Sequence, residues 1–143
     1  MKFILFMLVI CVTSDGYAQK QKDDQIFFQV FCGYDTETSQ EIQTLQAVSG
    51  LKDSVTVRKL LLEGSDYEQV LSAILLSHYS FNGLLKLSPG EVDKIDAIAH
   101  SKRKFILCYT CTFYSEGTLK QLFNERRYSD SYEIIKNYLL NGF

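Results

Sequence analysis

The residues best suited to chemistry are Cys108 and Cys111, which stand in a Cys-x-x-Cys spacing. Such a pair can carry out thiol–disulfide exchange when one thiol has a lowered pKa. A thioredoxin-like site needs the pair at the N-terminus of a helix within a β-α-β pattern, and the sequence shows no such pattern around it. Attachment of a c-type haem needs histidine directly after the second cysteine, and this chain has Thr112 there. The spacing alone therefore predicts no reaction.

Metal binding is the other chemistry that the pair suggests. A structural zinc site needs four ligands, commonly a second Cys/His pair at a defined spacing. The remaining candidates, Cys32, His78 and His100, are scattered along the chain. His78 falls on an apolar helical face without an acidic residue or serine spaced to orient it, so it reads as a hydrogen-bonded core residue. We predict no catalytic residue, no metal site and no cofactor, and keep a thiol-redox or metal-binding protein using the Cys108-x-x-Cys111 pair as the alternative function.

The first eighteen residues differ in kind from the rest. Met1-Lys2 gives a minimal positive start, residues 3–12 are continuously apolar, and small residues stand at Gly16 and Ala18. This layout is typical of a secretory signal peptide with cleavage after Ala18. The apolar run is shorter than the about 20 residues that a membrane-spanning helix needs. We therefore expect residues 1–18 to be removed, residues 19–23 to form a polar tether, and residues 24–143 to fold as one domain in the periplasm or outside the cell.

Three cysteines would remain in the exported chain, in a compartment that permits disulfides. An odd number leaves one thiol over or pairs it with another chain. The sequence predicts a bond from Cys32 to Cys108 or Cys111, which would close a loop of about 80 residues and contribute about 4 kcal/mol in the chain-entropy model. The spacing of Cys108 and Cys111 also permits a local bond.

Composition narrows the class of protein. The chain has 143 residues, enough for one domain, and 46% of them are hydrophobic, which is enough for a packed core. The net charge of −2 gives no general affinity for nucleic acid or for an anionic membrane. The one basic run, at residues 101–104, reads as a solvated face, with binding of a phosphate or an acidic group as the alternative. We predict no nucleic-acid partner and no stable membrane span after signal cleavage.

Helix-start signals are the clearest local features. Capping boxes begin at Thr38, Ser65 and Ser88, each with glutamate three residues later, and Ser88 is followed by proline at the first helical position. A cap-like start also stands at Asp130. Between Glu63 and the second box, Gly64 is a helix stop.

Two apolar segments are ambiguous. Residues 24–32 have apolar pairs four apart, which favours a short helix, but Ile26, Phe28 and Val30 also alternate as in a strand. Residues 105–114 are apolar nearly all round, which favours a buried helix, with a central strand as the alternative. Residues 101–104 are either a turn of one long helix or a break, and residues 115–118 read as a turn.

These features together predict an all-α protein, a compact bundle of six or seven short helices, with stacked helical hairpins as the variant. Residues 87–114 would be its central buried element. No family resemblance supports or opposes this prediction.

For function, the sequence favours an exported protein that acts by binding a protein partner, of inhibitor or toxin-neutralising type if the source is bacterial. The absence of a catalytic constellation, the small size and the export signal support this interpretation. Aromatic and arginine side chains are the usual anchors of interfaces, although each tyrosine could instead be half-buried in the core. The candidates are Tyr34, Tyr79, Tyr114, Arg126, Arg127 and Tyr132.

Overall fold

The computed structural model of the chain describes residues 25–30, 43, 45–46, 53–109 and 113–141. These residues form three strands: β1 (Gln25–Val30), β2 (Lys104–Tyr109) and β3 (Phe113–Thr118). They also form helices α3 (Ser54–Glu63), α4 (Asp66–Phe81), α5 (Pro89–Ala99), α6 (Leu119–Asn124) and α7 (Ser129–Asn141), with a 3-10 turn, η1 (Arg126–Tyr128). Residues 43, 45 and 46 are helical as well, and Leu45 is buried.

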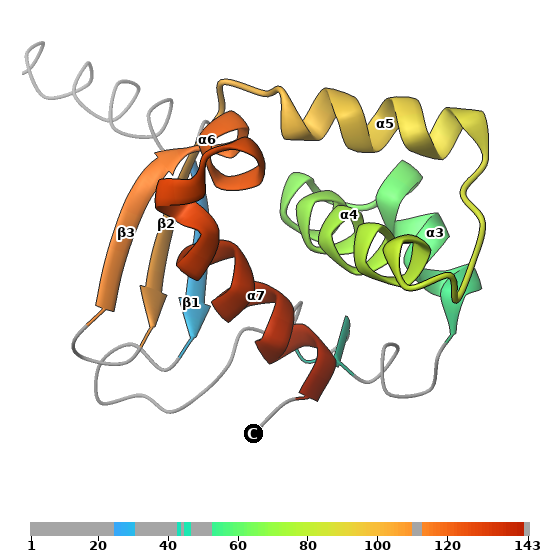
Figure 1. The fold of residues 1–143 in the computed structure, drawn as a ribbon, viewed down its shortest axis with the longest axis horizontal. Coiled ribbons are helices and arrows are strands. Elements are labelled where there is room, and N and C mark those ends of the chain that lie inside the picture. Colours follow the sequence, from blue (N-terminus) through green and yellow to red (C-terminus); the bar gives the residue numbers. More distant parts are fainter. Residues whose placement is uncertain (1–24, 31–42, 44, 47–52, 110–112, 142–143) are drawn as a thin grey trace, which may run out of the picture.

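The strands form one mixed sheet in the order β1-β2-β3. Strand β1 pairs with β2 in parallel, and β2 pairs with β3 in antiparallel orientation. A parallel pair needs a long crossover, and here the connecting chain contains α3, α4 and α5. Figure 1 shows the sheet on one side of the molecule, with α6 and α7 crossing in front of it and α3, α4 and α5 stacked beside it.

The predicted all-α bundle is therefore wrong. Residues 24–32, expected to be helical, contain β1, and residues 105–114 contribute most of β2 and the beginning of β3. Residues 115–118, expected to be a turn, belong to β3. The physical reason is that period-2 alternation prevails over the four-residue spacing once a neighbouring strand satisfies the backbone hydrogen bonds. Buried Ile26 and Phe28 alternate with exposed Gln25 and Phe27.

The helix-start signals are confirmed where the structure describes them. Ser65 and Ser88 each close a capping box with Glu68 and Glu91, and α5 has its proline in the first turn. Helix α7 begins at Ser129, next to the predicted start. The box at Thr38 lies outside the described residues. Helix α5 ends at Ala99 and β2 begins at Lys104, so the segment 101–104 is a break and not a turn of one long helix.

The central buried element is α4, not residues 87–114. All seven residues from Val70 to Leu76 are buried, so this helix is enclosed over more of its circumference than an amphipathic pattern predicts. Its Tyr67 ring packs on Phe28 of β1 with the ring centroids 5.3 Å apart. The α4 helix thus joins the sheet to the α3–α5 layer.

Gly117 of β3 lies close to two aromatic rings on the face of the sheet that the helices cover. A Cβ atom there would lie 3.0 Å from ring carbons of Phe105 and of Tyr128. We expect Gly117→Val to lower the free energy of unfolding by about 1–3 kcal/mol, because the two rings must move to admit the side chain. Gly90→Ala is the control, since a Cβ at Gly90 has nothing within 4 Å. Denaturant unfolding measures both variants, and equal destabilisation would contradict the close approach.

Candidate binding surface

In the described part of the chain, one face of the sheet is covered by helices and the other is not. On the covered face, Phe105 packs edge-on to Tyr128 of η1 at 5.8 Å between ring centroids. The Ser131 hydroxyl of α7 donates to the Ser115 hydroxyl at 2.9 Å. Together with Tyr67 of α4, these contacts cover all three strands from one side.

The opposite side, which we call the open face, is formed by outward-pointing residues of the three strands. Phe27 of β1 is 48% exposed and Tyr114 of β3 is 62% exposed. In the register, Phe27 is opposite Ile106, and Tyr114 is opposite Cys108 in the next row of the same face.

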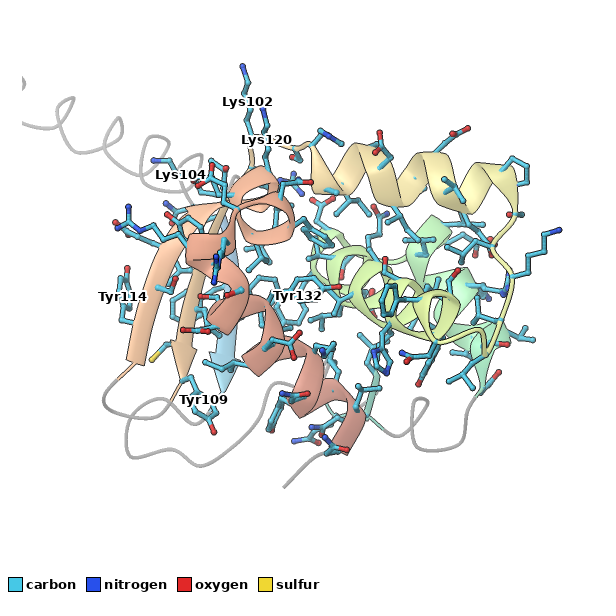
Figure 2. All side chains as sticks on the ribbon, viewed as in Figure 1. Lys102, Lys104, Tyr109, Tyr114, Lys120 and Tyr132 are labelled. Carbon is cyan, nitrogen blue, oxygen red and sulfur yellow. The ribbon has the colours of Figure 1, made fainter. Side chains whose placement is uncertain are left out.

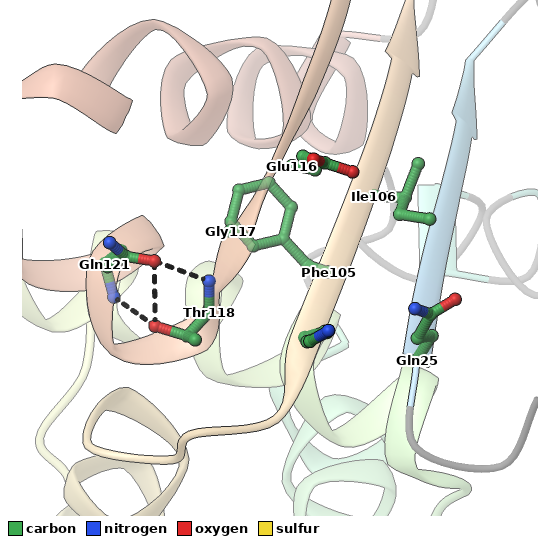
Figure 3. Close-up of a pocket in the computed structure, with 8 residues that line it drawn as sticks. Gln25, Phe105, Ile106, Glu116, Gly117, Thr118 and Gln121 are labelled. Carbon is green, nitrogen blue, oxygen red and sulfur yellow. Dashed lines mark hydrogen bonds between the residues drawn. The ribbon is translucent and has the colours of Figure 1, made fainter. Parts of the chain in front are cut away.

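A hollow of about 270 Å³ lies at one end of the open face. Figure 3 shows its lining, to which all three strands and α6 contribute. The lining residues are Gln25, Lys104, Phe105, Ile106, Glu116, Gly117, Thr118 and Gln121. The Gln121 side-chain oxygen accepts from the Thr118 backbone N–H at 2.9 Å and from its hydroxyl at 3.2 Å, which fixes one wall.

The hydrogen bond from the Tyr114 hydroxyl to a Glu116 carboxylate oxygen, at 3.1 Å, orders the polar part of this face. This bond to Glu116 is the main reason that the pKa of Tyr114 is raised above its usual value, with a smaller effect of desolvation. The phenol therefore stays neutral and donates its proton. A neutral tyrosine hydrogen-bonded to a carboxylate is a fixed pair of polar groups, and the polar groups of a partner can form hydrogen bonds with it.

Of the five predicted partner-binding residues that the structure describes, only Tyr114 lies on the open face. Arg126 and Tyr132 line a separate hollow of about 370 Å³ beside Glu133. Burial and, secondarily, the nearby Glu133 raise the pKa of Tyr132 to about 12, so this tyrosine behaves as a core residue.

The remaining candidates are dispersed. Arg127 lies over the ring of Tyr128, with its guanidinium carbon 5.9 Å from the ring centroid. Tyr79 is partly buried and lines a smaller hollow with Ser54, Leu84 and Leu85. Tyr34 lies outside the described residues. The five described candidates thus do not form one surface.

The cysteine prediction changes in two respects. The structure does contain a parallel pair joined through helices, so the stated reason for rejecting a thioredoxin-like arrangement is wrong. Cys108, however, lies in β2 and not at a helix N-terminus. Cys108 is the one cysteine among the described residues, so no disulfide joins two of these residues. Cys108 is not a free thiol. Cys32 and Cys111 lie outside the described residues.

The segment before Cys32 was expected to be a helix and contains strand β1, whereas the predicted bond of Cys32 lies outside the described residues. Within the described part of the chain, the N-terminal segment is held to residues 104–109 by the pairing of β1 with β2, in which Gln29 is opposite Cys108 and Val30 is opposite Tyr109. The described residues contain no group of three or more His, Cys, Asp or Glu side chains that could hold a metal ion. His78 is partly buried, and its backbone carbonyl accepts from Asn82 at 2.8 Å.

Glu91 and Arg58 form a largely buried ion pair between α5 and α3. One Arg58 nitrogen lies 2.5 and 2.6 Å from the two Glu91 oxygens, and the Glu91 side chain is only 7% exposed. The backbone N–H of Ser88 also donates to Glu91 at 2.7 Å. Burial opposes ionisation, but the Ser88 hydrogen bonds and the Arg58 guanidinium outweigh it, so the pKa of Glu91 is below its usual value. With its oxygens satisfied, Glu91 joins α3 to α5 rather than facing a ligand.

The residues of the open face that sequence reasoning missed are Phe27, Lys104, Ile106 and Glu116. The signal for Phe27 was present, because it is out of phase with the alternating Ile26, Phe28 and Val30. Lys104, Ile106 and Glu116 could be placed on this face only once residues 104–109 and 113–118 were known to be strands.

Comparison of the chain with protein-family models found no matching family, and comparisons with curated proteins and with solved structures found no significant match. None of the helices in the described part of the chain has both the length and the apolar character that crossing a membrane requires.

Proposed function

We propose that this protein is an exported binding protein that attaches to a protein partner through the open face of its sheet. The observation that carries the proposal is the pair of exposed rings, Phe27 and Tyr114, on either side of the central strand. Large aromatic side chains held on a rigid sheet are effective interface anchors, because little conformational entropy is lost when they are buried. Export rests on the signal-peptide layout of residues 1–18.

A second group of exposed apolar side chains gives the matched comparison. Phe81 is 91% exposed at the end of α4, and Leu84 is 68% exposed in the following turn. Scattered exposed apolar residues are common on protein surfaces and need no partner. The open face differs because its apolar residues lie in two adjacent rows on three hydrogen-bonded strands, and one of them, Ile106, lines a hollow with polar walls.

We expect the double variant Phe27→Ser/Tyr114→Ser to lose at least about tenfold in affinity for the partner, since truncation of a buried aromatic anchor commonly costs about 2 kcal/mol or more. The tagged full chain would be recovered from its own compartment and its co-purifying proteins quantified by mass spectrometry. The partner so identified would then be titrated against each variant.

Phe81→Ser/Leu84→Ser is the control and should retain the partner. Circular dichroism and thermal unfolding would show that both double variants are folded. The proposal is wrong if the wild-type chain retains no partner reproducibly. The assignment of the surface is wrong if the control pair, and not the open-face pair, abolishes capture.

A further inference from the structure

Three lysines gather at the end of the open face that carries the hollow. Lys104 is the first residue of β2, in which successive side chains point to opposite sides of the sheet, and its neighbour Phe105 is buried on the covered face. Arg103 forms an ion pair with Asp66 of α4, at 2.5 Å, on the covered side of the sheet. Lys104 therefore points to the open face, and Lys102 and Lys104 are both exposed.

Backbone hydrogen bonds bring the third lysine to the same place. The Lys120 N–H donates to the Ser101 carbonyl at 2.9 Å, and the Leu119 N–H donates to the Arg103 carbonyl at 2.8 Å. Lys104 is also paired with Thr118 in the β2–β3 ladder. Figure 2 shows Lys102, Lys104 and Lys120 at one end of the molecule. We call these three residues the lysine cluster.

None of the three ammonium groups has an ion-pair partner among the described residues, where the pairs formed are Arg58–Glu91, His100–Asp96, Arg103–Asp66 and Lys136–Glu133. Glu116 lines the same hollow as Lys104, but its carboxylate accepts from Tyr114. A local excess of positive charge thus stands on a chain whose net charge is −2. Like charges held together repel one another, and an anionic ligand relieves this repulsion.

We propose that the partner docks an acidic polypeptide segment, one bearing Asp or Glu side chains, on the lysine cluster, with its neighbouring residues on the open face. This proposal rests on the proposed function and specifies the chemistry of the partner. The carboxylates form ion pairs with Lys102, Lys104 and Lys120, while apolar groups of the same segment contact Ile106 in the hollow.

A polypeptide fits these observations better than a nucleic acid or a membrane. Proteins that hold DNA through its backbone commonly make about 6–10 phosphate contacts, and lipid-binding basic clusters contain about 4–8 Lys or Arg residues. Three lysines beside the Glu116 carboxylate are too few and too mixed in sign for either. Strand β3 is also an edge strand of the described sheet, and its free backbone groups are suited to an extended peptide.

Selection from a random twelve-residue peptide library displayed on phage tests the proposal, with the full chain as bait. We expect the selected peptides to be enriched in Asp and Glu over the starting library. That enrichment should disappear with the bait Lys102→Gln/Lys104→Gln/Lys120→Gln. A synthetic selected peptide should lose about tenfold or more in affinity for this triple variant and bind more weakly at 0.3 M than at 0.05 M NaCl.

Lys59→Gln/Lys86→Gln/Lys94→Gln is the matched control, because it removes the same charge from α3, α5 and the loop that precedes α5. Thermal unfolding checks that both triple variants are folded. The proposal of an acidic partner is wrong if no peptides are selected or if the selected peptides are not enriched in Asp and Glu. It is also wrong if the control triple variant abolishes that enrichment equally. It is also wrong if a single-stranded DNA 20-mer or phosphatidylserine vesicles bind the cluster and acidic peptides do not. Partner capture that depends on Phe27 and Tyr114 can survive each of these results, so the proposed function stands or falls separately.

Discussion

Replacing Phe105 with alanine is expected to lower the free energy of unfolding by about 3–5 kcal/mol. The Phe105 side chain is fully buried on the covered face of β2. Its ring contacts Phe28 of β1 at 6.4 Å and Tyr128 of η1 at 5.8 Å between centroids. Alanine would leave a cavity between the sheet and the helices that these rings now fill. Urea unfolding followed by far-ultraviolet circular dichroism measures the loss.

Ile106→Ala is the control for this prediction because Ile106 is the next residue in the same strand and points to the open face. We expect it to cost about 1 kcal/mol or less, since little packing is lost on the uncovered side. A helix over the same residues would place positions 105 and 106 only about 100° apart, and both would be buried. Equal costs at the two positions would contradict the strand and favour the helix that the sequence pattern suggested.

Glu91→Ala is expected to lower the free energy of unfolding by about 2–4 kcal/mol, because it leaves Arg58 without its carboxylate and removes the capping box of α5. The Arg58 side chain is 30% exposed and can regain some water, which places the effect below that of a fully buried pair. Asp96→Ala on the same helix is the control. Its carboxylate is 71% exposed, so we expect a change within about 0.5 kcal/mol. Chemical denaturation at pH 7 compares the two variants.

The pH dependence of the Glu91 effect has a definite sign. The pKa of Glu91 in the folded protein lies below its ordinary value of 4.5, so the ionised form contributes stability that is present above that value. The contribution is lost as the pH falls through the folded-state pKa. We therefore expect the stability difference between wild type and Glu91→Gln to be largest near neutral pH and to shrink below about pH 4.5. A difference that stays constant down to pH 3 would show that the carboxylate charge is not what stabilises the protein.

Local signals in the sequence were sufficient to predict the helices that begin with a capping box. Ser65 and Ser88 bind backbone groups only three residues away, so nothing distant is needed to make them caps. The apolar run at 105–109 carries no such local information. Its identity as a strand depends on pairing with β1, about 80 residues earlier in the chain, and with β3.

The open face could not be predicted for the same reason. Phe27 and Tyr114 are far apart in sequence, and only the register of three strands places them on one surface. The basic run was interpreted as a solvated face, which is the usual meaning of such a run. The ion pair of Arg103 with Asp66, and the place of Lys104 at the start of β2, depend on tertiary contacts that the sequence did not reveal. Tyr114 was identified for its residue type rather than for its position.

The parallel pairing of β1 with β2 also determines the order in which the sheet can assemble. Strand β1 comes first in the chain, yet its partner follows only after α3, α4 and α5 have been made. The helices, whose contacts are local, can form early, whereas closing a loop of about 80 residues slows the formation of the sheet. Until β2 arrives, β1 has an unpaired backbone and exposes Ile26, Phe27 and Phe28 to any neighbouring chain. Folding speed, and with it the tendency to aggregate, therefore depends on how soon β2 reaches β1.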